Sequence, residues 1–182
     1  MEQSKGKVVA VFGWSRPAET SAEYREAYVV GKLLAQKGFV VMNGGYGGTM
    51  EASARGAREN GGRSIGILSD EFHYLAPNPY NDETLSSPDL FSRIREMQRR
   101  ADGFIVLKGS MGTLAELSLV WNLSKIDLKQ RKPIILVGEH WAQVLRAWCE
   151  HLGVTPEEAA LLQCVDQPEQ AVELLVKQLC AK

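Results

Sequence analysis

The sequence has few residues that bind metals or form disulfides. It contains three cysteines, Cys149, Cys164 and Cys180, in no C-x-x-C spacing, and three histidines that form no ligand pattern with them. Structural metal sites depend on such spacings, so we expect no metal site and no resident cofactor. The odd number of cysteines favours a reducing compartment.

Unbalanced charge and long apolar runs are also missing. Lys and Arg total 21 against 22 Asp and Glu, a formal net charge of -1, so the chain lacks the basic field that non-specific nucleic-acid binding needs. No apolar run approaches the length of a membrane span, and the first residues show no signal-peptide pattern. We therefore expect a cytoplasmic protein with a small-molecule partner, and neither nucleic acid nor membrane as a partner.

What the sequence does contain is a series of short apolar runs. With 182 residues and 45% hydrophobic content, the chain can fill one core, and we predict a single domain over residues 1–182. Each run is apolar throughout, which is typical of strands buried on both faces of a parallel sheet. The predicted strands are Val8–Phe12, Phe39–Met42, Ser64–Leu68, Phe104–Leu107 and Pro133–Val137, with a last short strand near Leu162–Val165.

Helical periodicity fills the intervals between these strands. The predicted helices are Ser21–Lys37, Thr49–Asn60, Ser87–Arg100, Thr113–Ile126, His140–His151 and Pro168–Leu179, with a short helix opening at Thr155. This alternation predicts an α/β fold: a Rossmann-like, doubly wound, mainly parallel sheet with helices on both faces. Ligands of such sheets bind beyond the carboxyl ends of the strands, where the strand order reverses.

Turns that could hold a ligand follow three of the predicted strands, those that end at Phe12, Met42 and Leu107. The second and third of these turns are rich in glycine. Glycine lets the backbone approach an anion, and a helix N-terminus offers free N–H groups and a positive dipole end. Neither G-x-G-x-x-G after the first strand nor G-x-x-x-x-G-K-[ST] is present, so a mononucleotide fits better than NAD or ATP. The candidate ligand-binding residues are Gly13, Ser15, Gly44, Gly45, Gly47, Gly48, Thr49, Lys108, Gly109, Ser110, Met111, Gly112 and Thr113.

The last of these turns has two interpretations. Thr113-Leu114-Ala115-Glu116 fits the capping box S/T-x-x-E, which would make Glu116 only a helix-start residue. Alternatively, the Glu116 carboxylate belongs to the ligand site. The dipole at a helix start would then favour its ionised form, as a base or charge stabiliser rather than a general acid.

Two further segments bear on the site. Ser69–Ser86 is a long connection that we interpret either as a lid or binding loop or as a surface excursion without function. The helix that follows is rich in arginine. Arg93 and Arg100 lie beside its apolar face, whereas Arg95 and Arg99 point elsewhere.

Three motifs together resemble the LOG-like superfamily: G-G-x-G-G-T-M-E-A at Gly44–Ala52, an arginine-bearing helix that ends in Ala101-Asp102-Gly103-Phe104, and G-x-x-G-T-x-x-E at Gly109–Glu116. This superfamily comprises the LONELY GUY cytokinin-nucleotide phosphoribohydrolases, molybdenum-cofactor carrier proteins and bacterial proteins once labelled lysine decarboxylases. The resemblance implies a Rossmann-like nucleotide-binding fold in a homodimer or an assembly of dimers. It also implies Arg93 and Glu116 as the catalytic residues.

The chain departs from the hydrolase motifs at three positions. Lys108 replaces the proline of P-G-G-x-G-T-x-x-E, Ser110 replaces its second glycine, and Ile94 replaces the lysine of M-x-x-R-K. We see no site for the pyridoxal phosphate of a decarboxylase. The resemblance implies hydrolysis of the N-glycosidic bond of a nucleoside 5′-monophosphate; the alternative is a non-catalytic carrier or sensor of a phosphorylated ligand.

Overall fold

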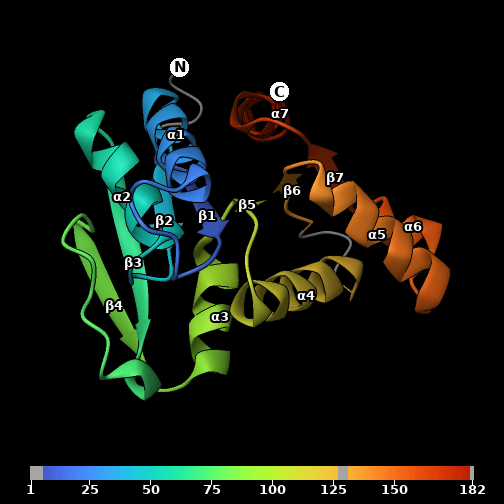
Figure 1. Cartoon of the computed structure of the whole chain (residues 1–182), viewed down its shortest axis with the longest axis horizontal. Helices are drawn as coiled ribbons and strands as arrows, with labels where there is room; N and C mark the ends of the chain where they lie inside the picture. The colour runs from blue at the N-terminus through green and yellow to red at the C-terminus, as the bar shows by residue number, and fades with distance from the viewer. Residues whose placement is uncertain (1–5, 127–130, 181–182) are drawn as a thin grey trace.

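A parallel sheet of seven strands forms the centre of the protein, in the order β4-β3-β2-β1-β5-β6-β7. The computed structural model describes residues 6–126 and 131–180. The strands are Val8–Phe12 (β1), Val40–Asn43 (β2), Arg63–Ser69 (β3), Glu83–Ser87 (β4), Gly103–Val106 (β5), Ile134–Val137 (β6) and Leu162–Val165 (β7). The order of the strands reverses between β1 and β5 (Figure 1). This arrangement confirms the predicted Rossmann-like, doubly wound fold and places the expected ligand crevice beside β1 and β5.

Helices cover both faces of the sheet (Figure 1). They are Ala22–Gln36 (α1), Thr49–Glu59 (α2), Leu90–Arg100 (α3), Met111–Ile126 (α4), His140–His151 (α5), Pro156–Ala159 (α6) and Pro168–Cys180 (α7). Side chains of a strand alternate between faces: Val9 and Val11 pack with α1, α2 and α7, whereas Ala10 and Phe12 pack with α3, α4 and α5. The strands are therefore buried on both sides, as their uniformly apolar sequences predict.

The segment Ser69–Ser86 is not one long loop. It holds a short 3-10 helix, Asp70–Phe72, and most of β4, which pairs in parallel with β3. The sequence E-T-L-S-S of β4 has no apolar run because the strand lies at the edge of the sheet and most of it faces solvent. The loop between the 3-10 helix and β4 is therefore only residues 73–82, and a role for it as a lid or binding loop stays a prediction.

Two predicted helix starts were also wrong. The helix predicted from Ser87 begins at Leu90, because Ser87 ends β4 and Asp89 is the N-cap, its Oδ1 accepting from Ser92 N at 2.7 Å. The helix predicted from Thr113 begins at Met111. Among the described residues, no helix is long and apolar enough to cross a membrane.

Candidate active site at the switch point of the sheet

Two threonines tie the helices α2 and α4 to the end of β1. The hydroxyl of Thr113, in the first turn of α4, donates to the carbonyl of Gly13 at 2.7 Å. The hydroxyl of Thr49, the first residue of α2, accepts from Trp14 N at 2.7 Å and contacts Trp14 O at 3.1 Å. The turns after β1, β2 and β5 therefore meet at one edge of the sheet, as predicted from their positions after parallel strands.

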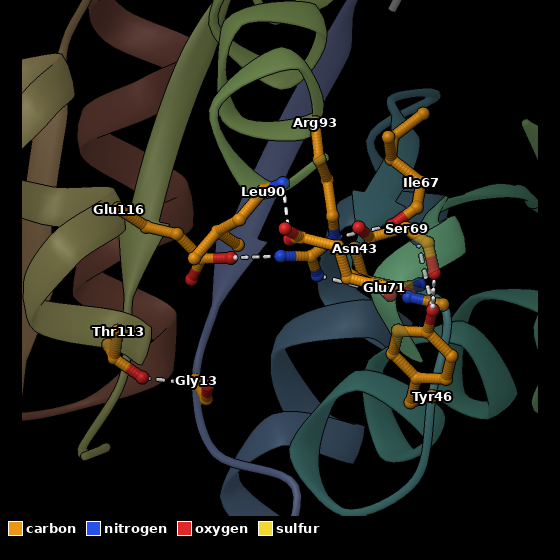
Figure 2. A network of polar contacts seen from close by, with 12 residues as sticks. Gly13, Asn43, Tyr46, Ile67, Ser69, Glu71, Leu90, Arg93, Thr113 and Glu116 are labelled. Atoms are coloured by element: carbon orange, nitrogen blue, oxygen red, sulfur yellow. Dashed lines mark hydrogen bonds and ion pairs between the residues drawn. The ribbon is translucent and has the colours of Figure 1, made fainter. Parts of the chain in front are cut away.

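A buried ion pair joins α3 and α4 at this edge. Arg93 Nη1 lies 3.1 Å from Glu116 Oε1, and the two residues are 5% and 6% exposed. Arg93 also donates from Nε to the carbonyl of Ile67 at 2.7 Å and from Nη2 to that of Gly44 at 3.1 Å (Figure 2). One side chain thus connects β3, the turn after β2 and α4, and the two residues proposed from the resemblance lie in direct contact.

The capping-box interpretation of Glu116 is wrong. Helix α4 begins at Met111, and Leu114 N donates to Ser110 O at 3.0 Å, so Thr113 lies inside the first turn and bonds to Gly13 instead. Glu116 therefore lies in the second turn and pairs with Arg93 rather than with the start of its own helix.

The expected electrostatic effect on Glu116 is also wrong in direction. Burial of its carboxyl raises the pKa of Glu116, and the charge and hydrogen bond of Arg93 oppose this effect. The cost of burying the charged carboxylate therefore outweighs the stabilisation that Arg93 gives it. The second oxygen, Oε2, makes no hydrogen bond to any described residue, so it is available to a water molecule or a ligand.

Most glycines at the site are required by protein packing. A Cβ at Gly44 would lie 1.9 Å from Arg93 Nη2, and one at Gly109 would lie 2.0 Å from Thr113 Oγ1. Gly45 and Gly48 have φ angles of 83° and 67°, a left-handed backbone conformation that residues with a Cβ rarely adopt. A Cβ at Gly13 would meet Thr49 Oγ1 at 2.2 Å. Contacts between protein atoms therefore account for glycine at these positions, without any ligand.

Gly47 and Gly112 differ from the others. A Cβ at Gly112 would have no neighbour within 4 Å, and one at Gly47 would meet only Ser15 O, at 3.9 Å. Neither has a positive φ angle, so neither the backbone conformation nor the surrounding protein requires glycine. Gly112 lies in the first turn of α4, four residues before Glu116 and hence on the same side of the helix.

Three asparagines that sequence reasoning did not propose support the turn after β2. Asn43 is fully buried; its Oδ1 accepts from Gly45 N at 2.7 Å and its Nδ2 donates to Asn81 Oδ1 at 3.1 Å. Asn78 Nδ2 donates to Tyr46 O at 3.0 Å. The sequence did hold one signal: Asn43 occupies the end of β2, where a dinucleotide-binding fold carries an acid.

The remaining predicted ligand residues are exposed. Lys108 Nζ pairs with Glu23 Oε1 at 3.2 Å, so its cation already has a partner on α1. Ser15 and Ser110 are exposed, and Met111 is 76% exposed. These residues are exposed, whereas Arg93 and Glu116 are buried, and their side chains point toward one another (Figure 2).

The model of the SLOG cluster4 family, a group of LOG-like proteins, matches residues 6–172. The chain belongs to this family. Both glycine-rich turns and the Arg93–Glu116 pair lie inside the matched range. Membership in the SLOG cluster4 family thus confirms the resemblance that the three sequence motifs indicated.

Relatives of this SLOG cluster4 member include named enzymes and solved structures. The chain is 34% identical to the cytokinin riboside 5′-monophosphate phosphoribohydrolase of Mycobacterium tuberculosis over 173 residues, 90% of each chain. The molybdenum cofactor binding protein of Rippkaea orientalis is 26% identical with a TM-score of 0.77, covering 97% of this chain and 99% of that one. The molybdenum cofactor carrier protein of Chlamydomonas reinhardtii, at 24% identity and a TM-score of 0.71, covers 98% and 100% and shares the fold.

Proposed function

We propose that this protein hydrolyses nucleoside 5′-monophosphates to a free base and ribose 5-phosphate. The observation that carries the proposal is the buried Arg93–Glu116 pair, which lies beside a helix N-terminus kept open at Gly112. The similarity to a cytokinin riboside 5′-monophosphate phosphoribohydrolase over 90% of the chain supports the same reaction. The bond that breaks joins C1′ of ribose to a nitrogen of the base.

Glu116 supplies the chemistry in this proposal. Hydrolysis adds the oxygen of water to C1′ and a proton to the departing base, through an oxocarbenium-like ribose as in glycoside hydrolysis. A carboxylate beside C1′ stabilises that positive charge and orients or deprotonates the water. Oε2 of Glu116 is available for this role, while Oε1 is held by Arg93. The proton for the base comes from solvent.

The N-terminus of α4 is the proposed phosphate site. Its first N–H groups, from Met111 to Thr113, have no partners within the helix, and the helix dipole adds positive charge there. The hydroxyl of Thr113 already donates to Gly13 O, so the backbone rather than that hydroxyl binds the 5′-phosphate. Arg93 has five N–H groups and makes three hydrogen bonds, which leaves one hydrogen on each Nη atom for the ligand.

A carrier or sensor of a phosphorylated ligand is the second candidate. One observation favours it: three donors of Arg93 are held by protein oxygens, as a purely structural arginine would be. The similarity to a molybdenum cofactor binding protein over 97% of the chain is consistent with that function. The two candidates use the same anion-binding helix and differ in whether Glu116 acts on the ligand.

The proposal also covers the domain organisation, location and assembly of the protein. We propose one nucleotide-binding domain in the cytoplasm, supported by the single sheet and by three free thiols. We also propose a homodimer or an assembly of dimers, since Phe91, Met111 and Ile126 expose 76%, 76% and 69% of their surface on α3 and α4 and exposed apolar side chains favour association. Light scattering after gel filtration tests the assembly; a monomer at micromolar concentration would contradict it.

Release of free base tests the reaction. Purified protein is incubated with AMP and with a cytokinin riboside 5′-monophosphate, and base is separated by chromatography. We expect both wild type and Glu139→Gln, a control at an exposed acid, to release base. Glu116→Gln should bind the nucleotide but turn over at least about 100-fold more slowly. Binding without release by the wild type would establish the carrier or sensor instead, and absence of binding would contradict both.

A further inference from the structure

Helix α3 carries three further arginines besides Arg93. Of its four arginines, Arg93 is buried in the ion pair with Glu116, whereas Arg95, Arg99 and Arg100 are exposed. Arg95 and Arg99 are four residues apart, so their side chains start about 6 Å from one another on one side of the helix. Arg95 and Arg99 thus lie on a different side of the helix from Arg93.

These three arginines line a groove of about 430 Å³ between α3 and the end of β4. Small side chains, among them Ser87 and Pro88, form its other wall. Ser87 is 6% exposed, and its hydroxyl makes no hydrogen bond to any described residue. The volume is within the range of small-molecule sites.

The groove keeps an excess of positive charge. Its one acid, Glu96, is shared by Arg99, whose Nη2 lies 2.9 Å away, and by Arg100. Hydrogen bonds from these two arginines lower the pKa of Glu96 to about 2, so the acid stays ionised near neutral pH and balances one of the three cations. Arg95 makes no hydrogen bond or close ion pair with the described residues; it interacts through charge alone with Asp89, whose carboxylate caps α3.

We propose that this groove binds a small anion with two or more phosphate groups. Guanidinium groups donate paired hydrogen bonds to phosphate oxygens; Arg95 has its donors free for this, and three arginines against one acid give the groove an excess of positive charge that a multiply charged anion matches. The backbone of α3 separates this groove from the crevice, since Arg93 leaves the helix towards Gly44 and Ile67. The site is therefore additional to the one that holds the nucleotide, and its occupation does not depend on the proposed hydrolysis.

Calorimetric titration with inorganic pyrophosphate at fixed ionic strength tests this site. Two charge-matched variants are compared with the wild type: Arg95→Gln/Arg99→Gln in the groove, and Arg146→Gln/Lys177→Gln at exposed positions of α5 and α7. We expect the wild type and the control to bind equally, and the groove variant to bind at least tenfold more weakly. Equal binding by all three proteins, or an equal loss in the two variants, would overturn the proposal.

Two further measurements separate this site from the crevice. AMP binding by the groove variant should equal that of the wild type, because Arg95 and Arg99 do not contact the crevice residues. Pyrophosphate binding should survive in Gly112→Ala, which alters the crevice alone. Loss of pyrophosphate binding in Gly112→Ala would place the anion in the crevice, and displacement of pyrophosphate by an oligothymidine would assign the groove to nucleic acid; either result overturns the proposal.

Discussion

The two glycine-rich turns look alike in sequence but are built differently. The first turn, residues 44–48, is almost entirely buried and is held by Asn43, Asn78 and Arg93. The second turn, residues 108–112, is largely exposed, and it leads into α4 with open space at Gly112. Most glycines of the first turn let protein atoms approach one another, whereas Gly112, after the second turn, has no protein atom beside it.

This difference separates structural glycines from ligand-facing ones. A glycine-rich motif alone predicts that the backbone needs space, and only the neighbouring atoms show whether protein or ligand fills it. At Gly44 the space is taken by Arg93, whereas at Gly112 it is empty. The following changes test the distinction, in order of decreasing expected effect on folding stability.

Arg93→Met should have the largest effect, because Arg93 connects the first turn, β3 and α4. Removing one partner of a buried ion pair destabilises a protein by about 3–5 kcal/mol. Glu116 would then be buried without a counterion, and its already raised pKa would rise further. The group would be neutral in the fold but ionised in the unfolded chain as the pH rises above 4.5.

Chemical denaturation across a range of pH measures that effect. The stability deficit of Arg93→Met should be smallest below pH 4.5, the ordinary value for glutamate, and should grow as the pH rises towards the raised pKa. Arg95→Gln on the exposed side of the same helix is the control and should change stability little. A deficit that does not vary with pH would show that Glu116 does not depend on Arg93 for its charge.

Gly44→Ala should destabilise the first turn by about 1–3 kcal/mol, the usual cost of overpacking. The new Cβ would lie 1.9 Å from Arg93 Nη2 and 2.5 Å from Met50 Sδ. Displacement of Arg93 should also reduce turnover. Gly153→Ala, where a Cβ meets no atom within 4 Å, is the matched control in thermal unfolding. Equal stability of the two variants would contradict the structural role of Gly44.

Gly112→Ala should separate function from stability. Alanine is favoured over glycine in a helix by up to about 1 kcal/mol, so the variant should be as stable as the wild type or slightly more stable. Its methyl group would occupy the open space beside the N-terminus of α4, and AMP should bind at least tenfold more weakly. Undiminished AMP binding by a folded Gly112→Ala protein would remove the N-terminus of α4 from the proposed site.

Lys108→Met should have the smallest effect on folding stability. Its pair with Glu23 is exposed, and such pairs contribute under about 1 kcal/mol. If Lys108 serves the ligand, Lys108→Met should raise the KM for AMP while Glu23→Gln, which frees the lysine, should leave it unchanged or lower it. Steady-state kinetics at low and high salt measures both. An unchanged KM in Lys108→Met would limit this residue to its contact with α1.

The sequence was sufficient to predict the fold because its central strands are uniformly apolar. The first and last residues of β1 and β6 were predicted to within one residue. It was insufficient at β4, where an edge position allows the polar sequence of Glu83–Ser87. The start of α3 was misplaced for the same reason, since Ser87 and Pro88 belong to the strand and the turn. Edge strands carry little of the hydrophobic signal on which such predictions rest.

The two central residues of the candidate site could be predicted, but the hydrogen bonds between the site residues could not. Arg93 and Glu116 were identified through a resemblance, while their contact, and the bonds of Arg93 to Ile67 and Gly44, depend on how four segments meet. The roles of Asn78 and Asn81 were missed because they lie in an irregular segment with no periodic pattern. Long-range polar contacts of this kind leave no local pattern in a sequence.

The hydrogen bonds of Arg93 have a consequence for folding kinetics. They join residues 23, 26 and 49 positions apart in the chain, so we expect them to form late in folding, once β2, β3, α3 and α4 have assembled. Contacts absent from the folding transition state act mainly on the rate of unfolding. We therefore expect a variant without Arg93 to fold at nearly the wild-type rate but to unfold faster. The unfolding rate determines how long each molecule keeps its candidate site intact.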